Sequence, residues 1–114
     1  MTKSTTLKAN TLTASAAQAA MNAGDLNSRQ LVEACLARSA ERDEDVGAWI
    51  YLNPDLALSQ ADACDQARAE GKELGPLHGI PVGLKDIIDT ADMPTANGSD
   101  LFAGRRPVAD SAIA

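Results

Sequence analysis

Aromatic residues are almost missing from this sequence: 114 residues include one Trp, one Tyr and one Phe. Large aromatic side chains contribute most to the apolar area of a core. Their place is taken by alanine, which accounts for 22 residues and buries little area per side chain. The composition therefore predicts helices around a thin core, with limited capacity to fold as an independent globule.

Clusters of positive charge are also missing. The net charge is −6, and the only adjacent basic pair is Arg105-Arg106, which we interpret as a solvated turn. Nucleic-acid binding requires a basic surface, so nucleic acid is not an expected partner. No apolar run reaches membrane-spanning length, and the first residues lack the apolar segment of a secretion signal. We expect a soluble, cytoplasmic protein with no membrane partner.

Residues that bind transition metals are few. Cys35 and Cys64 are the only cysteines and His78 is the only histidine. The cysteines could form a disulfide or join a metal site, but two small, buried apolar side chains on helices are favoured in a chain without a secretion signal. With no cysteine or second histidine beside it, His78 is expected to be a loop residue rather than a zinc ligand.

Three carboxylates recur at every third residue, at Asp86, Asp89 and Asp92. Such a set could bind a hard cation. In a strand followed by a turn, however, this spacing does not bring the three side chains to one side. We therefore expect solvated carboxylates, and neither a metal nor a cofactor.

A polar tail over residues 1–11 is expected to fray, and a first helix to follow it. Thr13 can cap a helix over residues 14–23, and Gly24 can end it. Residues 48–52, AWIYL, are rich in β-forming side chains and are expected to be extended.

The second helix has the clearest start signal. Asn27 followed by Gln30 forms a capping-box pattern, and Leu26 and Leu31 can make the accompanying hydrophobic staple. An apolar stripe with helical spacing continues from there. We expect this helix to end near Arg42, before a charged turn.

The third helix should begin at Asn53, with Pro54 in its first turn, and run to Glu70 before Gly71. A cap followed by proline is a typical helix start, and a glycine a typical stop. The face expected to pack inward consists of Ala57, Ala61 and Cys64.

At Gly75-Pro76 the alanine-rich sequence changes to Gly, Pro, Ile and Val. The run GIPVGLKD, from Gly79, has the alternation of a strand, with its apolar side chains on one face and Lys85 on the other. Gly83, on the same face as Lys85, marks a position that another group can approach closely. From the pattern alone, Lys85 is either a solvated lysine on a half-exposed strand or a lysine held in a dry crevice, where a neutral amine can act as a general base.

The run GPLHGIPVGLKDIIDTADMPTANGSDLFAGRRPVADSAIA, residues 75–114, resembles the amidase signature family of Ser–cis-Ser–Lys hydrolases. The resemblance extends back to about residue 12. It implies an α/β fold in which N-terminal helices precede a mixed β-sheet core flanked by helices. Residues 1–114 are then an incomplete N-terminal fragment of one amidase domain. Its helical segment covers about 12–74, and about 75–114 form the start of the α/β core with its first strand or strands.

The same resemblance implies that Lys85 is the catalytic base. In that family the neutral lysine takes a proton from a serine in a cis peptide, which relays it from a second serine, the nucleophile. An acyl-serine forms, and a carboxylic amide C–N bond is hydrolysed. The implied partner of the full-length enzyme is a small-molecule amide. The alternative within the family is an amidotransferase subunit.

This sequence departs from the family pattern after Lys85. No Gly/Ser-rich signature follows, and neither Ser99 nor Ser111 has a second serine beside it, so neither is expected to be a nucleophile. We therefore expect an N-terminal fragment that is inactive alone. The alternative is a non-catalytic interaction module or a remnant. An unpaired sheet edge further predicts marginal stability or self-association.

Overall fold

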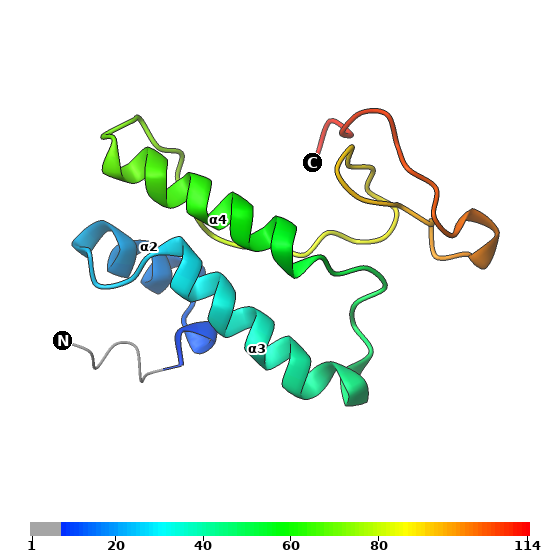
Figure 1. The fold of residues 1–114 in the computed structure, drawn as a ribbon, viewed down its shortest axis with the longest axis horizontal. Coiled ribbons are helices and arrows are strands. Elements are labelled where there is room, and N and C mark those ends of the chain that lie inside the picture. Colours follow the sequence, from blue (N-terminus) through cyan, green and yellow to red (C-terminus); the bar gives the residue numbers. More distant parts are fainter. Residues whose placement is uncertain (1–7) are drawn as a thin grey trace. The chain divides into compact units, whose positions relative to one another are not determined.

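The computed structural model describes residues 8–114, and all their regular structure is helical (Figure 1). The elements are the 3-10 helix η1 (Ala9–Thr11), the α-helices α2 (Ala14–Ala23), α3 (Ser28–Val46) and α4 (Pro54–Ala69), and the 3-10 helix η2 (Asp100–Phe102). They belong to two units. The helical unit comprises residues up to Ala48 together with Asn53–Pro81, and the loop unit comprises Trp49–Leu52 together with Val82–Ala114.

Helix α2 has the predicted boundaries. The hydroxyl of Thr13 accepts a hydrogen bond from the Ala16 N–H at 3.0 Å, which satisfies one of the free donors at the helix start. Gly24 follows the last turn with φ of 83°, the left-handed conformation that glycine adopts without strain. Both boundary signals are local, and both are confirmed.

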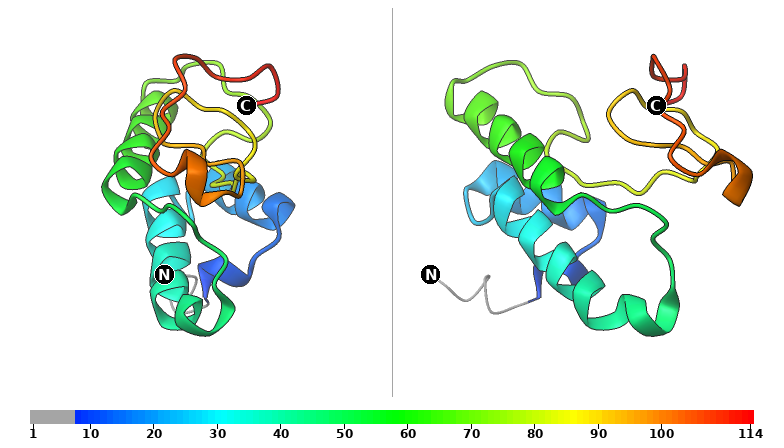
Figure 2. Two further views of the ribbon diagram at one scale, coloured as in Figure 1. Left: turned by 90° about the vertical axis from the view of Figure 1, so that its right-hand side faces the viewer. Right: turned by 45° about the vertical axis from the view of Figure 1, so that its right-hand side comes forward.

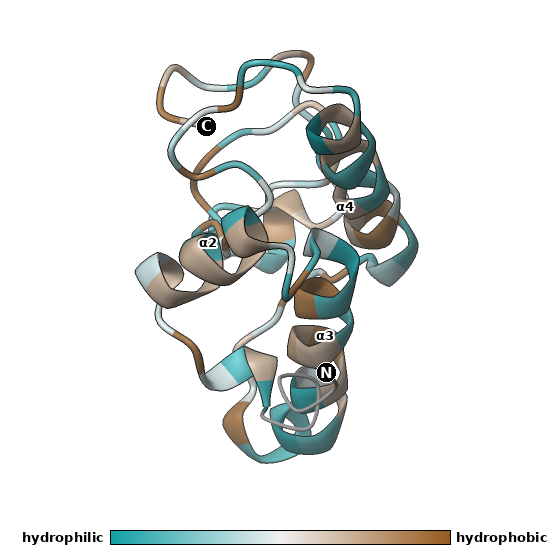
Figure 3. Ribbon diagram, turned by 90° about the vertical axis from the view of Figure 1, so that its left-hand side faces the viewer, coloured by the Kyte–Doolittle hydropathy of each residue, from teal (hydrophilic) through white to brown (hydrophobic). Residues whose placement is uncertain are grey.

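Helix α3 begins as predicted and ends later. Asn27 and Gln30 form both capping-box hydrogen bonds, at 2.7 and 3.0 Å. The helix continues to Val46, four residues past Arg42, and Gly47 with φ of 65° ends it. The predicted end was wrong because exposed charged residues are compatible with a helix, whereas a glycine in the left-handed conformation is not. The C-terminal part of α3 is indeed hydrophilic (Figure 3).

Helix α4 also confirms its prediction. The Asn53 side chain accepts a hydrogen bond from the Leu56 N–H at 3.1 Å, and Pro54 occupies the first turn. Helices α3 and α4 lie side by side in all the ribbon views (Figures 1 and 2). Ala61, on the predicted inward face, is 3% exposed. A methyl group at this position allows the helices to approach closely.

The core of the helical unit is small. It consists of Ala9, Ala17, Met21, Leu26 and Leu31. The two residues of the predicted hydrophobic staple, Leu26 and Leu31, are both in it. Ala9 belongs to η1, so the prediction of a frayed tail is wrong for residues 9–11, because a buried methyl group anchors them. The rest of that predicted tail, residues 1–7, lies outside the described residues.

A carboxylate from α4 binds the start of α3. The oxygens of Asp65 accept hydrogen bonds from the backbone N–H groups of Ser28 at 2.7 Å and Arg29 at 3.0 Å. Negative charge at a helix N-terminus is favourable because the free N–H groups and the helix dipole are positive there. Arg29 also pairs with Asp62 of α4 at 2.7 Å. These contacts join residues 33 to 37 positions apart, on two consecutive helices.

No strand is present among residues 8–114. The strand predicted from Gly79 and the extended run 48–52 are irregular instead, so the predicted sheet is not confirmed. A strand requires a neighbouring strand to bind its N–H and C=O groups. Neither segment has such a partner within the described chain.

Candidate functional site

The chain that leads to Lys85 is fixed at its start by the helical unit. The Ser28 hydroxyl donates a hydrogen bond to the Gly79 carbonyl at 2.8 Å, and the His78 Nε2 lies 2.8 Å from the Cys64 carbonyl. Gly79 has φ of 83°, and a Cβ built there would lie 3.2 Å from the Met21 sulfur. His78 is therefore a loop residue with a structural contact, and Gly79 is required by both conformation and space.

Lys85 itself lies in the loop unit, in an irregular segment, with an exposed side chain. Its carbonyl accepts a hydrogen bond from the Ile88 N–H at 3.0 Å, which closes a turn directly after it. Two residues earlier, a Cβ built on Gly83 would lie 3.1 Å from the Trp49 ring. The sequence predicted a close approach at Gly83, and the approaching group is this indole.

Asp86, the residue after Lys85, accepts two hydrogen bonds from backbone N–H groups. One Asp86 oxygen accepts a hydrogen bond from the Ala96 N–H at 2.8 Å, and the other accepts one from the Gly98 N–H at 3.1 Å. Asn97, between the two donors, and Gly98 have positive φ of 56° and 72°, and the Ser99 N–H donates to the Ala96 carbonyl at 3.0 Å. This is a tight turn of the kind that Asn-Gly favours.

Asp89 forms a second anchor of the loop unit. Arg105 donates two hydrogen bonds to its carboxylate, at 2.9 and 3.0 Å, and a third to the Thr95 carbonyl at 3.2 Å. Hydrogen bonding from Arg105 lowers the pKa of Asp89, and the same contact raises the pKa of Arg105. Asp89 and Arg105 are thus paired as well as partly solvated, and the sequence pattern did not predict the pair because it joins residues that are distant in sequence.

The two serines after Lys85 have local roles. The Ser99 hydroxyl accepts a hydrogen bond from the Leu101 N–H at 3.2 Å and caps η2. The Ser111 N–H donates to the Asp89 carbonyl at 2.9 Å, while the Ser111 hydroxyl is buried without a hydrogen-bond partner. Within residues 8–114 no hydrogen bond joins either hydroxyl to Lys85. The structure therefore does not assemble a nucleophile and base from these residues.

Sequence reasoning missed the role of Asp86. The spacing of the three aspartates bears only on a metal site, and by itself it predicts a solvated carboxylate at this position. The signal that could have identified it is the Asn97-Gly98 pair, which predicts a tight turn with outward N–H groups about ten residues later. In the described chain, no group of three His, Cys, Asp or Glu side chains is placed to hold a metal ion.

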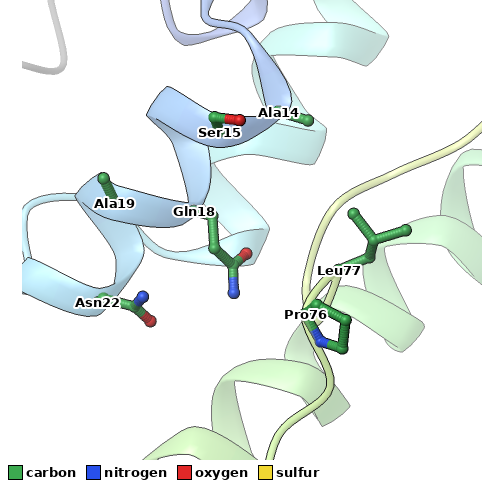
Figure 4. Close-up of a pocket in the computed structure, with 7 residues that line it drawn as sticks. All are labelled: Ala14, Ser15, Gln18, Ala19, Asn22, Pro76 and Leu77. Atoms are coloured by element: carbon green, nitrogen blue, oxygen red, sulfur yellow. The ribbon is translucent and has the colours of Figure 1, made fainter.

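The two cysteines are free, half-buried thiols, and burial raises the pKa of Cys35. A hollow of about 360 Å³ lies between α2 and the turn at residues 76–77 (Figure 4). It is lined by Ala14, Ser15, Gln18, Ala19, Asn22, Pro76 and Leu77. Since no ionisable side chain lines this hollow, it offers no group for acid–base chemistry.

None of the helices within residues 8–114 combines the length and apolar character that crossing a membrane requires.

Comparisons with known proteins agree on one family. The family model for Amidase matches residues 30–114. The chain is 49% identical over 96 residues to a glutamyl-tRNA(Gln) amidotransferase subunit of Chloroflexus aurantiacus, a match that covers 84% of this chain and 20% of that protein.

The solved structures agree with the sequence relatives. Native peptide amidase from Stenotrophomonas maltophilia matches with a TM-score of 0.81 and 43% identity, over 89% of this chain and 21% of that one. The corresponding amidotransferase subunit of Streptomyces coelicolor is 41% identical over 102 residues, which is 90% of this chain and 20% of that protein. The chain thus spans about a fifth of the length of these relatives.

Proposed function

The chain belongs to the amidase family, and we propose that it supplies the lysine base of an amide-hydrolysing site of that family. The observation that carries this proposal is the family match across residues 30–114, because it includes Lys85 and the whole run around it. The 43% identity to peptide amidase, at a TM-score of 0.81, supports the same assignment.

The proposed reaction is hydrolysis of a carboxylic amide through an acyl-serine. The neutral Lys85 amine accepts a proton that passes through one serine from a second, nucleophilic serine. The nucleophile attacks the amide carbon, the C–N bond breaks, and the amine leaves with a proton. Water then attacks the acyl-serine, giving the carboxylic acid and the free serine. In this proposal both serines come from the part of an amidase that lies beyond the matched segment.

The surface of the loop unit supports the idea that further amidase residues pack on it. Its buried residues are two threonines, Thr90 and Thr95, whereas Leu101, Val108 and Ile113 are 90%, 99% and 77% exposed. A unit with exposed aliphatic side chains and no apolar core gains little free energy by folding alone. We therefore propose that the chain alone is inactive, marginally stable and inclined to self-associate.

Two further possibilities are kept within the proposal. The 49% identity to the Chloroflexus aurantiacus protein makes an amidotransferase subunit the second candidate. The net charge of −6 indicates that this part of such a protein does not contact RNA. The two free thiols fit a reducing compartment, so we propose a cytoplasmic location.

The other candidate is a non-catalytic interaction module. Such a module would bind a partner without any dependence on Lys85.

A segment exchange tests the proposal. Residues 8–114 replace the part of Stenotrophomonas maltophilia peptide amidase that they match, and ammonia release from a peptide amide is measured. We expect turnover by this chimera, and a loss of at least about 100-fold in Lys85→Ala, the range for a general base. The matched control is Lys72→Ala, because Lys72 pairs with Glu70 on the surface of the helical unit.

Circular dichroism and thermal unfolding show whether each chimera is folded. A folded chimera that releases no ammonia, or one in which Lys85→Ala is as active as Lys72→Ala, would contradict the proposed function. The 114-residue chain is assayed alone in parallel. Ammonia release by that chain that disappears in Lys85→Ala would show that it does not need the remaining residues.

A further inference from the structure

We propose that Asp86 is a positioning residue for Lys85, and that it acts by binding the backbone of the Ala96–Ser99 turn. The proposal rests on the proposed function only for the importance of Lys85. The contacts of Asp86 stand independently of it. No metal, cofactor or partner is needed for this role.

Within residues 8–114, the Asp86 carboxylate accepts hydrogen bonds from two backbone N–H groups and forms no ion pair. Its oxygens bind the N–H groups of Ala96 and Gly98 at 2.8 and 3.1 Å, one oxygen to each donor. The positive φ of Asn97 and Gly98 turns the backbone so that both N–H groups face the same carboxylate. Hydrogen bonds from backbone N–H groups to a carboxylate are stronger than those between neutral groups.

These bonds matter for Lys85 because the lysine has no strand to hold it. Within the described residues the backbone of Lys85 makes one hydrogen bond, from the Ile88 N–H to its carbonyl. The next anchor is Asp86, one residue later. A base in a proton relay must stay within hydrogen-bond distance of its partner, and a displacement of about 1 Å can lower the rate about 100-fold. Fixing the residue beside the lysine limits such displacement.

The rest of the loop unit is held by contacts that do not involve Asp86. The Thr95 N–H donates to the Arg105 carbonyl at 2.9 Å, and the Arg105 side chain binds Asp89. The loop beyond Asp86 therefore remains attached when the Asp86 carboxylate is removed. We expect removal of the Asp86 carboxylate to increase the mobility of the Lys85 backbone without unfolding the loop unit.

Hydrogen exchange by NMR on the folded peptide amidase chimera tests the contact, because the loop unit is not expected to be stable in the chain alone. In Asp86→Ala we expect the Ala96 and Gly98 amides to exchange at least about tenfold faster, because both lose their acceptor. In Asp86→Asn one acceptor oxygen remains, so one amide should keep most of its protection. Asp100→Ala is the control, since Asp100 is exposed in the same unit and is not the acceptor of the Ala96 or Gly98 N–H group. The Leu31 amide in α3 reports whether the helical unit stays folded.

Kinetics in the peptide amidase chimera test the consequence. We expect Asp86→Ala to lower kcat at least about tenfold with KM within about twofold, because the lysine is misplaced while substrate binding is kept. Asp86→Asn should recover part of kcat, and Asp100→Ala should match the unsubstituted chimera. If Asp86→Ala abolishes folding, the comparison between Asp86→Asn and Asp100→Asn replaces it.

The possible results separate this inference from the proposed function. A folded but inactive unsubstituted chimera contradicts the proposed function and leaves the exchange result as the test of the contact. Unchanged exchange at Ala96 and Gly98 in Asp86→Ala overturns the inference. Faster exchange with kcat equal to that of Asp100→Ala also overturns it, because Asp86 then holds only its turn.

Discussion

Gly79→Ala is the substitution whose cost the structure predicts in most detail. Gly79 connects the helical unit to the lysine segment, and two separate features require glycine there. Its φ of 83° is unfavourable for any residue with a Cβ. A Cβ would also lie 3.2 Å from the Met21 sulfur and 3.3 Å from the Ser28 Cβ.

The expected cost is a sum of two terms. The left-handed conformation costs alanine about 1–2 kcal/mol. The two short contacts add about 1 kcal/mol, the low end for overpacking, because the Met21 side chain can move by a few tenths of an ångström. Ser28 cannot yield as easily, since it starts α3 and its hydroxyl binds the Gly79 carbonyl. We expect Gly79→Ala to lower the free energy of unfolding by about 2–3 kcal/mol.

Two other glycines separate these terms. Gly71 has φ of 74° with open space around its Cβ position, so Gly71→Ala should show only the conformational cost, about 1–2 kcal/mol. Gly75 has neither a positive φ nor a neighbour within 4 Å, so Gly75→Ala should be neutral or stabilising by up to about 1 kcal/mol. Urea unfolding followed by far-UV circular dichroism measures all three variants.

The relative losses of unfolding free energy in the three variants test this reasoning. A cost for Gly79→Ala equal to that of Gly71→Ala would refute the steric contribution from Met21 and Ser28. A cost equal to that of Gly75→Ala would refute both contributions, and with them the placement of Gly79 against the core.

Two further predictions concern carboxylates. Asp65→Asn should destabilise the chain by about 1–2 kcal/mol in urea unfolding, because it removes a charged acceptor at the start of α3. Asp62→Asn should lower the free energy of unfolding far less, because the ion pair of Asp62 is exposed. Equal losses in the two variants would contradict the capping role of Asp65. The Arg105 contact lowers the pKa of Asp89 below its ordinary 3.8, so the pair stabilises the fold above that pH and the stabilisation disappears as the pH falls through the lowered value. The difference in thermal midpoint between the wild-type chain and Asp89→Asn should therefore shrink from about pH 6 to about pH 2, and a difference that grows on acidification would refute the assignment.

The helices could be predicted because their signals are local. Thr13, Asn27 and Asn53 each bind an N–H three residues away, so the sequence pattern and the contact coincide. The prediction for the end of α3 failed at Arg42 because no local rule forbids a charged, exposed turn of helix before Gly47. The signal for this end, Gly47, is also local, and it outweighs the charged run before it.

The loop unit could not be predicted because its contacts join distant residues. Asp86 binds amides 10 and 12 positions away, and Asp89 binds Arg105, 16 positions away. Periodicity says nothing about such pairs, so the carboxylates were interpreted as solvated. The alternation around Lys85 predicted a strand, but a strand also needs a neighbour, and the pattern of one segment cannot supply it.

The central claim, that Lys85 is a base, is tested most directly by Lys85→Arg in the peptide amidase chimera. Arginine has a side chain of similar length, but its guanidinium stays charged and does not give up a proton at any pH that the assay can use. The account predicts that Lys85→Arg releases ammonia from the peptide amide as slowly as Lys85→Ala, at least about 100-fold below the unsubstituted chimera. Activity of Lys85→Arg close to that of the unsubstituted chimera would contradict the account, because it would show that position 85 contributes charge rather than a base.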